Sequence, residues 1–126
     1  MFYDFAVVSG PYLMHSPSQT FHAHLSTFST LCQRANPDPR ELQGTFLAVQ
    51  QVFQQQILPL GTASQPGIQP LLTEMNRTLR LVAMDVAFLQ TARQTITRQQ
   101  RQRQMLTKLA QLETFTTSLQ QALDPD

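Results

Sequence analysis

A chain of 126 residues is long enough for one domain with a buried core. Its formal net charge of +1 argues against a strong general attraction to nucleic acid or anionic membranes. Only 13% of the residues are charged, whereas 19 are Gln, so the polar surfaces are expected to be largely uncharged. The single Cys32 cannot form an internal disulfide, which favours a reducing cytoplasm.

The first 15 residues differ from the rest and are expected to form a loosely ordered tail, unless Met14 is the true start. Their apolar run, residues 5–8, is far shorter than the ~18 residues of a membrane span. No basic residue precedes the run, so a secretory signal is not expected either. A single helical domain is therefore predicted over residues 16–124.

Two helix starts carry the same local signals, a capping residue followed by Pro and then by Gln or Glu. Ser16-Pro17-Ser18-Gln19 begins the first predicted helix, which runs to about Ala35. Asp38-Pro39-Arg40-Glu41 begins the second, which Pro59 ends by excluding Leu58 from helical geometry. Residues 61–69, with two Gly and one Pro, are expected to form a flexible loop.

The long segment from Leu71 to Leu123 contains no Gly or Pro, yet it carries two apolar stripes that are out of phase. The first stripe is Leu72, Met75, Leu79, Val82, Val86 and Leu89; the second is Met105, Leu109, Leu112, Thr116, Leu119 and Leu123. One straight helix cannot present both stripes to one surface. A capping box at residues 97–100 therefore predicts a turn near residues 94–97, between a third helix starting at Pro70 and a fourth.

These four helices predict an all-α fold, an up-down-up-down four-helix bundle. The rival interpretation is one continuous helix of ~80 Å after residue 70, which would force dimerisation.

A second apolar stripe, Leu81, Met84 and Phe88, lies on the other side of the third helix. Either the first two helices cover it, or it is an exposed patch for a partner or for self-association. Asp85 lies within this stripe. It is either a carboxylate at the bundle edge paired with an Arg, or a contact that orients a partner.

Basic residues gather where the fourth helix begins: Arg93, Arg98, Arg101, Arg103 and Lys108. The cluster lacks interleaved aromatic residues, so its signal for nucleic-acid binding is weak. Cations at a helix start interact unfavourably with the helix dipole and cost a little stability. One interpretation is therefore that the cluster contacts an anionic group. The simpler interpretation is a solvated helix start.

Little in the sequence indicates catalysis. His22 and His24 lie ~200° apart on a helix and cannot bind one metal ion together. Cys32 falls on an apolar stripe and is expected to be a buried, inert thiol. No phosphate-binding loop or metal-binding motif occurs. We therefore expect no enzyme activity, no catalytic residue, no metal and no cofactor.

One resemblance adds to this interpretation. Residues 53–60 (FQQQILPL), followed by residues 79–81 (LRL), 84–90 (MDVAFLQ) and 92–93 (AR), resemble the small cyanobacterial PatD-type heterocyst frequency control proteins. The resemblance is good over about residues 49–93, is looser through the fourth predicted helix, and does not cover residues 1–35. It implies a non-enzymatic cytoplasmic regulator that acts on cell division by associating with the tubulin-like FtsZ, and thereby on heterocyst differentiation.

The expected function is therefore association with another protein, with FtsZ as the implied partner. The candidate partner-binding residues are Arg80, Leu81, Met84, Asp85, Phe88, Arg93, Arg98 and Arg101. Two alternatives stay open: a nucleic-acid-binding helical module that uses the Arg93–Lys108 cluster, and a purely structural homodimer.

Overall fold

The computed structural model describes residues 16–63 and 66–123, and this part of the chain is helical without strands, which confirms the all-α prediction. The long helices are α1 (Pro17–Cys32), α2 (Pro39–Val52), α4 (Gln69–Thr91) and α5 (Thr95–Leu123). The expectations for residues 1–15, including the alternative start at Met14, lie outside the described residues. Within those residues no helix combines the length and the apolar character needed to cross a lipid bilayer.

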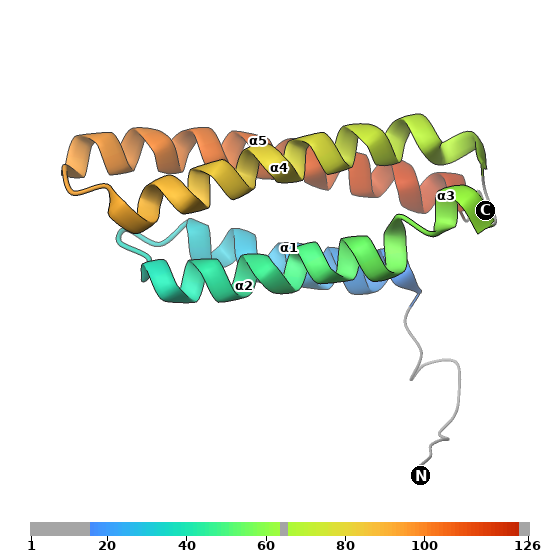
Figure 1. The fold of residues 1–126 in the computed structure, drawn as a ribbon, viewed down its shortest axis with the longest axis horizontal. Coiled ribbons are helices and arrows are strands. Elements are labelled where there is room, and N and C mark those ends of the chain that lie inside the picture. Colours follow the sequence, from blue (N-terminus) through green and yellow to red (C-terminus); the bar gives the residue numbers. More distant parts are fainter. Residues whose placement is uncertain (1–15, 64–65, 124–126) are drawn as a thin grey trace, which may run out of the picture.

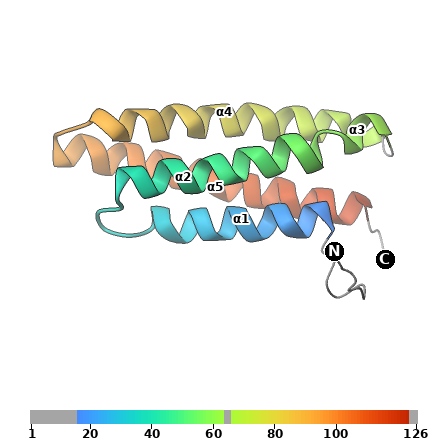
Figure 2. The same ribbon diagram turned by 60° about the horizontal axis from the view of Figure 1, so that its bottom comes forward.

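The four long helices lie side by side, and each contacts two others. α1 contacts α2 and α5, and α4 also contacts α2 and α5. Successive long helices reverse direction in both ribbon views, which is compatible with the predicted up-down-up-down order (Figures 1 and 2). α4 ends at Thr91 and α5 folds back against it, so the continuous helix of the rival interpretation does not form.

The predicted starts of the first two helices are confirmed. The Ser16 Oγ accepts a hydrogen bond from the Gln19 N–H at 3.2 Å, and the Gln19 side chain accepts one from the Ser16 N–H at 3.0 Å. The Asp38 carboxylate accepts from the Glu41 N–H at 3.1 Å. These bonds satisfy amide groups that have no partner inside the helix.

The end of the first helix was predicted too late, since α1 stops at Cys32 rather than near Ala35. The Gln102 side chain of α5 donates to the backbone carbonyls of Cys32 and Arg34. This amide supplies a partner from another helix for the last carbonyl of α1 and for one carbonyl of the following connection, so the helix does not need to continue.

The second helix does not run as a regular α-helix to its proline. After Val52 the backbone widens into a π-helix, Phe53–Ile57, and the Leu58 N–H donates to the Phe53 carbonyl at 2.9 Å. The wider turn keeps both Phe53 and Ile57 in the core. The following segment is also more regular than the predicted loop, with a short helix α3 (Leu60–Ala63) and a 3₁₀ turn (Pro66–Ile68).

The predicted turn between the third and fourth helices is present, but it lies at residues 92–94 rather than near residues 94–97, and the predicted cap is wrong. Ala92 adopts an extended backbone, which ends α4. α5 begins at Thr95, and the Arg98 N–H donates to the Gln94 carbonyl at 3.0 Å. Thr97 therefore lies inside the first turn of α5 and does not cap it.

The core is built from the predicted stripes. Leu79, Val82, Val86 and Leu89 of α4 are buried, as are Met105, Leu109, Leu112 and Leu119 of α5. Two tilted aromatic pairs extend the core from α1 to α2 and to the π-helical segment after it, with ring centroids 5.4 Å apart for Phe28 and Phe46 and 5.8 Å for Phe21 and Phe53. The two out-of-phase stripes thus meet in one core because the turn reorients α5.

Candidate functional site

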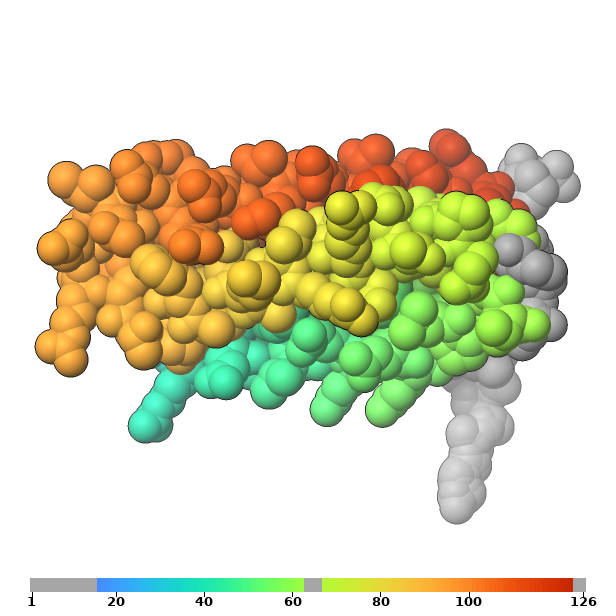
Figure 3. Space-filling view, turned by 45° about the horizontal axis from the view of Figure 1, so that its top comes forward, coloured from blue at the N-terminus to red at the C-terminus, as the bar shows by residue number. Residues whose placement is uncertain are grey.

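Three residues form an apolar row on the outer side of α4, which we call the α4 stripe: Leu81, Met84 and Phe88. Leu81 is 43% exposed and Met84 is 63% exposed, while Phe88 is half-buried. Their spacing of three and four residues places them on one side of the helix. Figure 3 shows α4, in yellow, open to the surface between α5 and α2.

Asp85 lies beside the α4 stripe but points inward. It is 1% exposed, and its carboxylate contacts Arg101 at 3.2 Å and Lys108 at 2.7 Å. Both cations belong to α5 and lie seven residues, about two helical turns, apart on it. The prediction that Asp85 contacts a partner is wrong for this structure, because its side chain is almost fully buried. The alternative of a pair with an Arg is confirmed, but the carboxylate is buried between α4 and α5 rather than placed at the bundle edge.

Arg101 also connects this ion cluster to the α4 stripe. Its guanidinium lies over the Phe88 ring, 4.1 Å from the ring centroid, a geometry that favours a cation–π interaction. The first two helices were expected to provide any cover for this stripe. Instead α5 provides it, through a cation at Phe88, whereas Leu81 and Met84 stay open.

The α2 side of α4 carries a shallow groove that none of the residues of the α4 stripe lines. Its volume is about 170 Å³, and Leu47, Ala83 and Ala87 are among its lining residues. Leu47 is exposed, so apolar surface continues from α4 onto α2. Such continuity favours contact with a protein surface over a small ligand, which needs a deeper enclosure.

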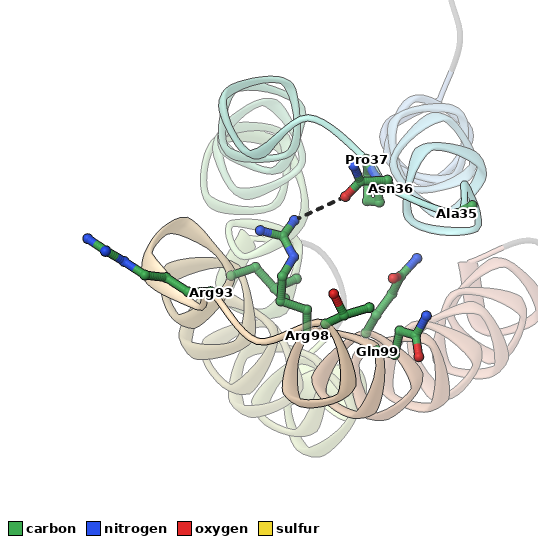
Figure 4. A pocket seen from close by; sticks show the side chains of 9 residues that line it. Ala35, Asn36, Pro37, Arg93, Arg98 and Gln99 are labelled. Atoms are coloured by element: carbon green, nitrogen blue, oxygen red, sulfur yellow. Dashed lines mark hydrogen bonds between the residues drawn. The ribbon is translucent and has the colours of Figure 1, made fainter.

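Of the remaining predicted residues, Arg80 lies beside the α4 stripe, whereas Arg93 and Arg98 lie at the end of the bundle. Arg80 is exposed on α4 next to Met84, without an ion pair among the described residues. Arg98 donates to the Ala92 carbonyl at 3.3 Å and to the Asn36 side chain at 3.5 Å. Figure 4 shows the pocket between the α1–α2 and α4–α5 connections, with Arg98 reaching toward Asn36 and Arg93 pointing away from the pocket.

The basic cluster is consequently divided. Arg101 and Lys108 direct their charges to Asp85, and Arg98 holds two loops together at the end of the bundle. Arg93 and Arg103 are exposed. A surface that follows a nucleic-acid backbone needs a continuous row of free cations, which this arrangement does not offer.

The pocket at this end of the bundle, about 330 Å³, lies between the α1–α2 and α4–α5 connections. Gln102 and Arg98 both line it and already bond to backbone carbonyls there. Its polar groups thus serve to join the loops. We assign it no ligand.

The described cysteine and histidine side chains are not arranged for catalysis or metal binding. Cys32 is fully buried, and this burial raises the pKa of its thiol to about 12, so it stays protonated near neutral pH. His22 is exposed on α1. In the described ranges no group of three His, Cys, Asp or Glu side chains is placed to hold a metal ion.

Comparisons of the chain with protein-family models, with curated proteins and with solved structures found no match.

Proposed function

We propose that this protein is a non-enzymatic regulator that acts by binding another protein through the α4 stripe. The observation that carries the proposal is the exposure of Leu81 and Met84 in the middle of a 23-residue helix. Apolar side chains gathered on an outer helix face often mark a protein-binding surface. Phe88, beside them, supplies the kind of aromatic anchor found at the centre of many interfaces.

The support beneath the stripe strengthens the proposal. Asp85, Arg101 and Lys108 join α4 to α5 near Phe88, and Arg101 covers one face of its ring. A binding surface on a restrained helix loses less conformational entropy when it binds than one on a loop.

For the partner, we propose FtsZ, because residues 49–93 resemble the PatD-type proteins and this range contains the whole α4 stripe. On this proposal the protein acts in the cytoplasm, modulates cell division, and thereby affects heterocyst frequency. The lone Cys32 agrees with a reducing compartment.

The test is a titration of the fluorescently labelled protein with FtsZ from the same organism. Met84→Ser should weaken binding by about fivefold or more, as expected for loss of a central apolar contact. Ile96→Ser is the matched control, because Ile96 is also an exposed apolar residue but lies at the start of α5. Absence of binding, or equal losses in both variants, would contradict the proposal.

A further inference from the structure

The α4 stripe lies on a domain with surplus positive charge. The described residues contain all nine Lys and Arg of the chain but only five acids, Asp38, Glu41, Glu74, Asp85 and Glu113. The folded part therefore has an excess of four positive charges. The other three acids of the chain belong to its two ends, outside the described residues.

The charged side chains next to the α4 stripe also carry an excess of positive charge. On the α2 side, Arg80 lies one turn before Met84 and is exposed. On the α5 side, Arg101 and Lys108 share the single carboxylate of Asp85, which leaves one positive charge in excess. Because Asp85 is buried while both cations keep part of their surface in solvent, the outward-facing charge is positive on both sides of the stripe.

We propose that the α4 stripe binds an acidic amphipathic segment of a partner protein, an inference that rests on the proposed function and names the partner's chemistry. The apolar side of a helix would lie on Leu81, Met84 and Phe88. Carboxylates on its two edges would reach Arg80 on one side and the exposed parts of Arg101 and Lys108 on the other. Arg guanidinium groups bind carboxylates with paired hydrogen bonds.

The same charges disfavour a second copy of this chain as the occupant. Two copies meeting through this face would bring Arg80 and the Arg101–Lys108 pair of each close to those of the other. Like charges across an interface oppose association unless other groups compensate. The acidic partner is therefore the better fit.

The experiment uses three synthetic peptides of about 18 residues, long enough for five helical turns. The first has leucines at helical spacing flanked by glutamates; the second replaces every glutamate with lysine; the third is a scrambled version of the first. Fluorescence anisotropy should show binding of the first peptide, and at least about tenfold weaker binding of the other two. Raising NaCl from about 50 to about 300 mM should weaken the first complex.

A pair of charge variants then locates the site. Arg80→Gln should weaken binding of the acidic peptide by about fivefold. Arg103→Gln removes the same charge from an exposed position on α5, about 160° around the helix from the core-facing Met105, and should leave the affinity within about twofold. Equal binding of the acidic and lysine peptides, or equal losses in both variants, would overturn the inference.

The same variants separate this inference from the proposed function. If FtsZ binding falls in Met84→Ser but is unchanged in Arg80→Gln, and the acidic peptide does not bind, the proposed function stands and the inference fails. If the acidic peptide binds as described and FtsZ does not, the inference stands and FtsZ is the wrong partner. Sedimentation that shows a dimer broken by Met84→Ser would overturn the inference in favour of a second copy.

Discussion

Replacing Asp85 with Asn should destabilise the fold, although the sequence alone allowed Asp85 a place at a partner surface. The carboxylate is 1% exposed and contacts two cations, at 3.2 and 2.7 Å. Hydrogen bonds to charged groups contribute about 1.5–3 kcal/mol each. The side chains of Arg101 and Lys108 are 33% and 23% exposed, so water can partly replace the lost carboxylate. We therefore expect a net loss of about 2–3 kcal/mol.

The assay is urea unfolding followed by far-ultraviolet circular dichroism, with the free energy of unfolding extrapolated to water. Glu74→Gln is the matched control, because Glu74 is also on α4 and also pairs with an Arg, at 3.5 Å. That pair is exposed, so its loss should cost less than about 0.5 kcal/mol. A double-mutant cycle of Asp85→Asn with Lys108→Met should give a coupling energy of about 1–2 kcal/mol.

A loss below about 0.5 kcal/mol in Asp85→Asn, equal to that of Glu74→Gln, would refute this reasoning. It would mean that the free-energy cost of burying the carboxylate is as large as the stabilisation from its two ion pairs. A coupling energy near zero would show that Lys108 does not depend on Asp85.

Three further predictions concern the core, the thiol and the α4–α5 hairpin. Leu79→Ala should cost about 2–5 kcal/mol in urea unfolding, because Leu79 is buried in the core; a loss below about 1 kcal/mol would contradict this placement. Burial raises the pKa of Cys32 in the folded state to about 12, so above about pH 9 the thiol loses its proton in the unfolded state but keeps it in the folded state. The free energy of unfolding should therefore fall with rising pH, by up to about 1.4 kcal/mol per pH unit, until about pH 12. Cys32→Ala should remove that part of the slope, and an unchanged slope would show that the folded thiol titrates normally. Spin labels at positions 77 and 120 should lie well under the ~60 Å that one continuous helix requires, since α5 folds back along α4.

Features that depend on residues close together in the chain could be predicted from the sequence. The starts at Ser16 and Asp38 were predictable because a capping side chain bonds to an amide only three residues away. The core stripes of α4 and α5 were predictable because helical spacing places their apolar residues on one side. The turn between them followed from the mismatch of those two stripes.

Features that depend on how the helices pack against one another could not be predicted from the sequence. Asp85 points inward because the register of α5 against α4 brings Arg101 and Lys108 to it, 16 and 23 residues away along the chain. The seven-residue spacing of these cations on α5 was a visible signal, but nothing local identified their common partner. In the same way, the early end of α1 depends on Gln102, 70 residues from Cys32. Such contacts form only when complete helices pack together, because no interaction within either segment places the two residues opposite each other.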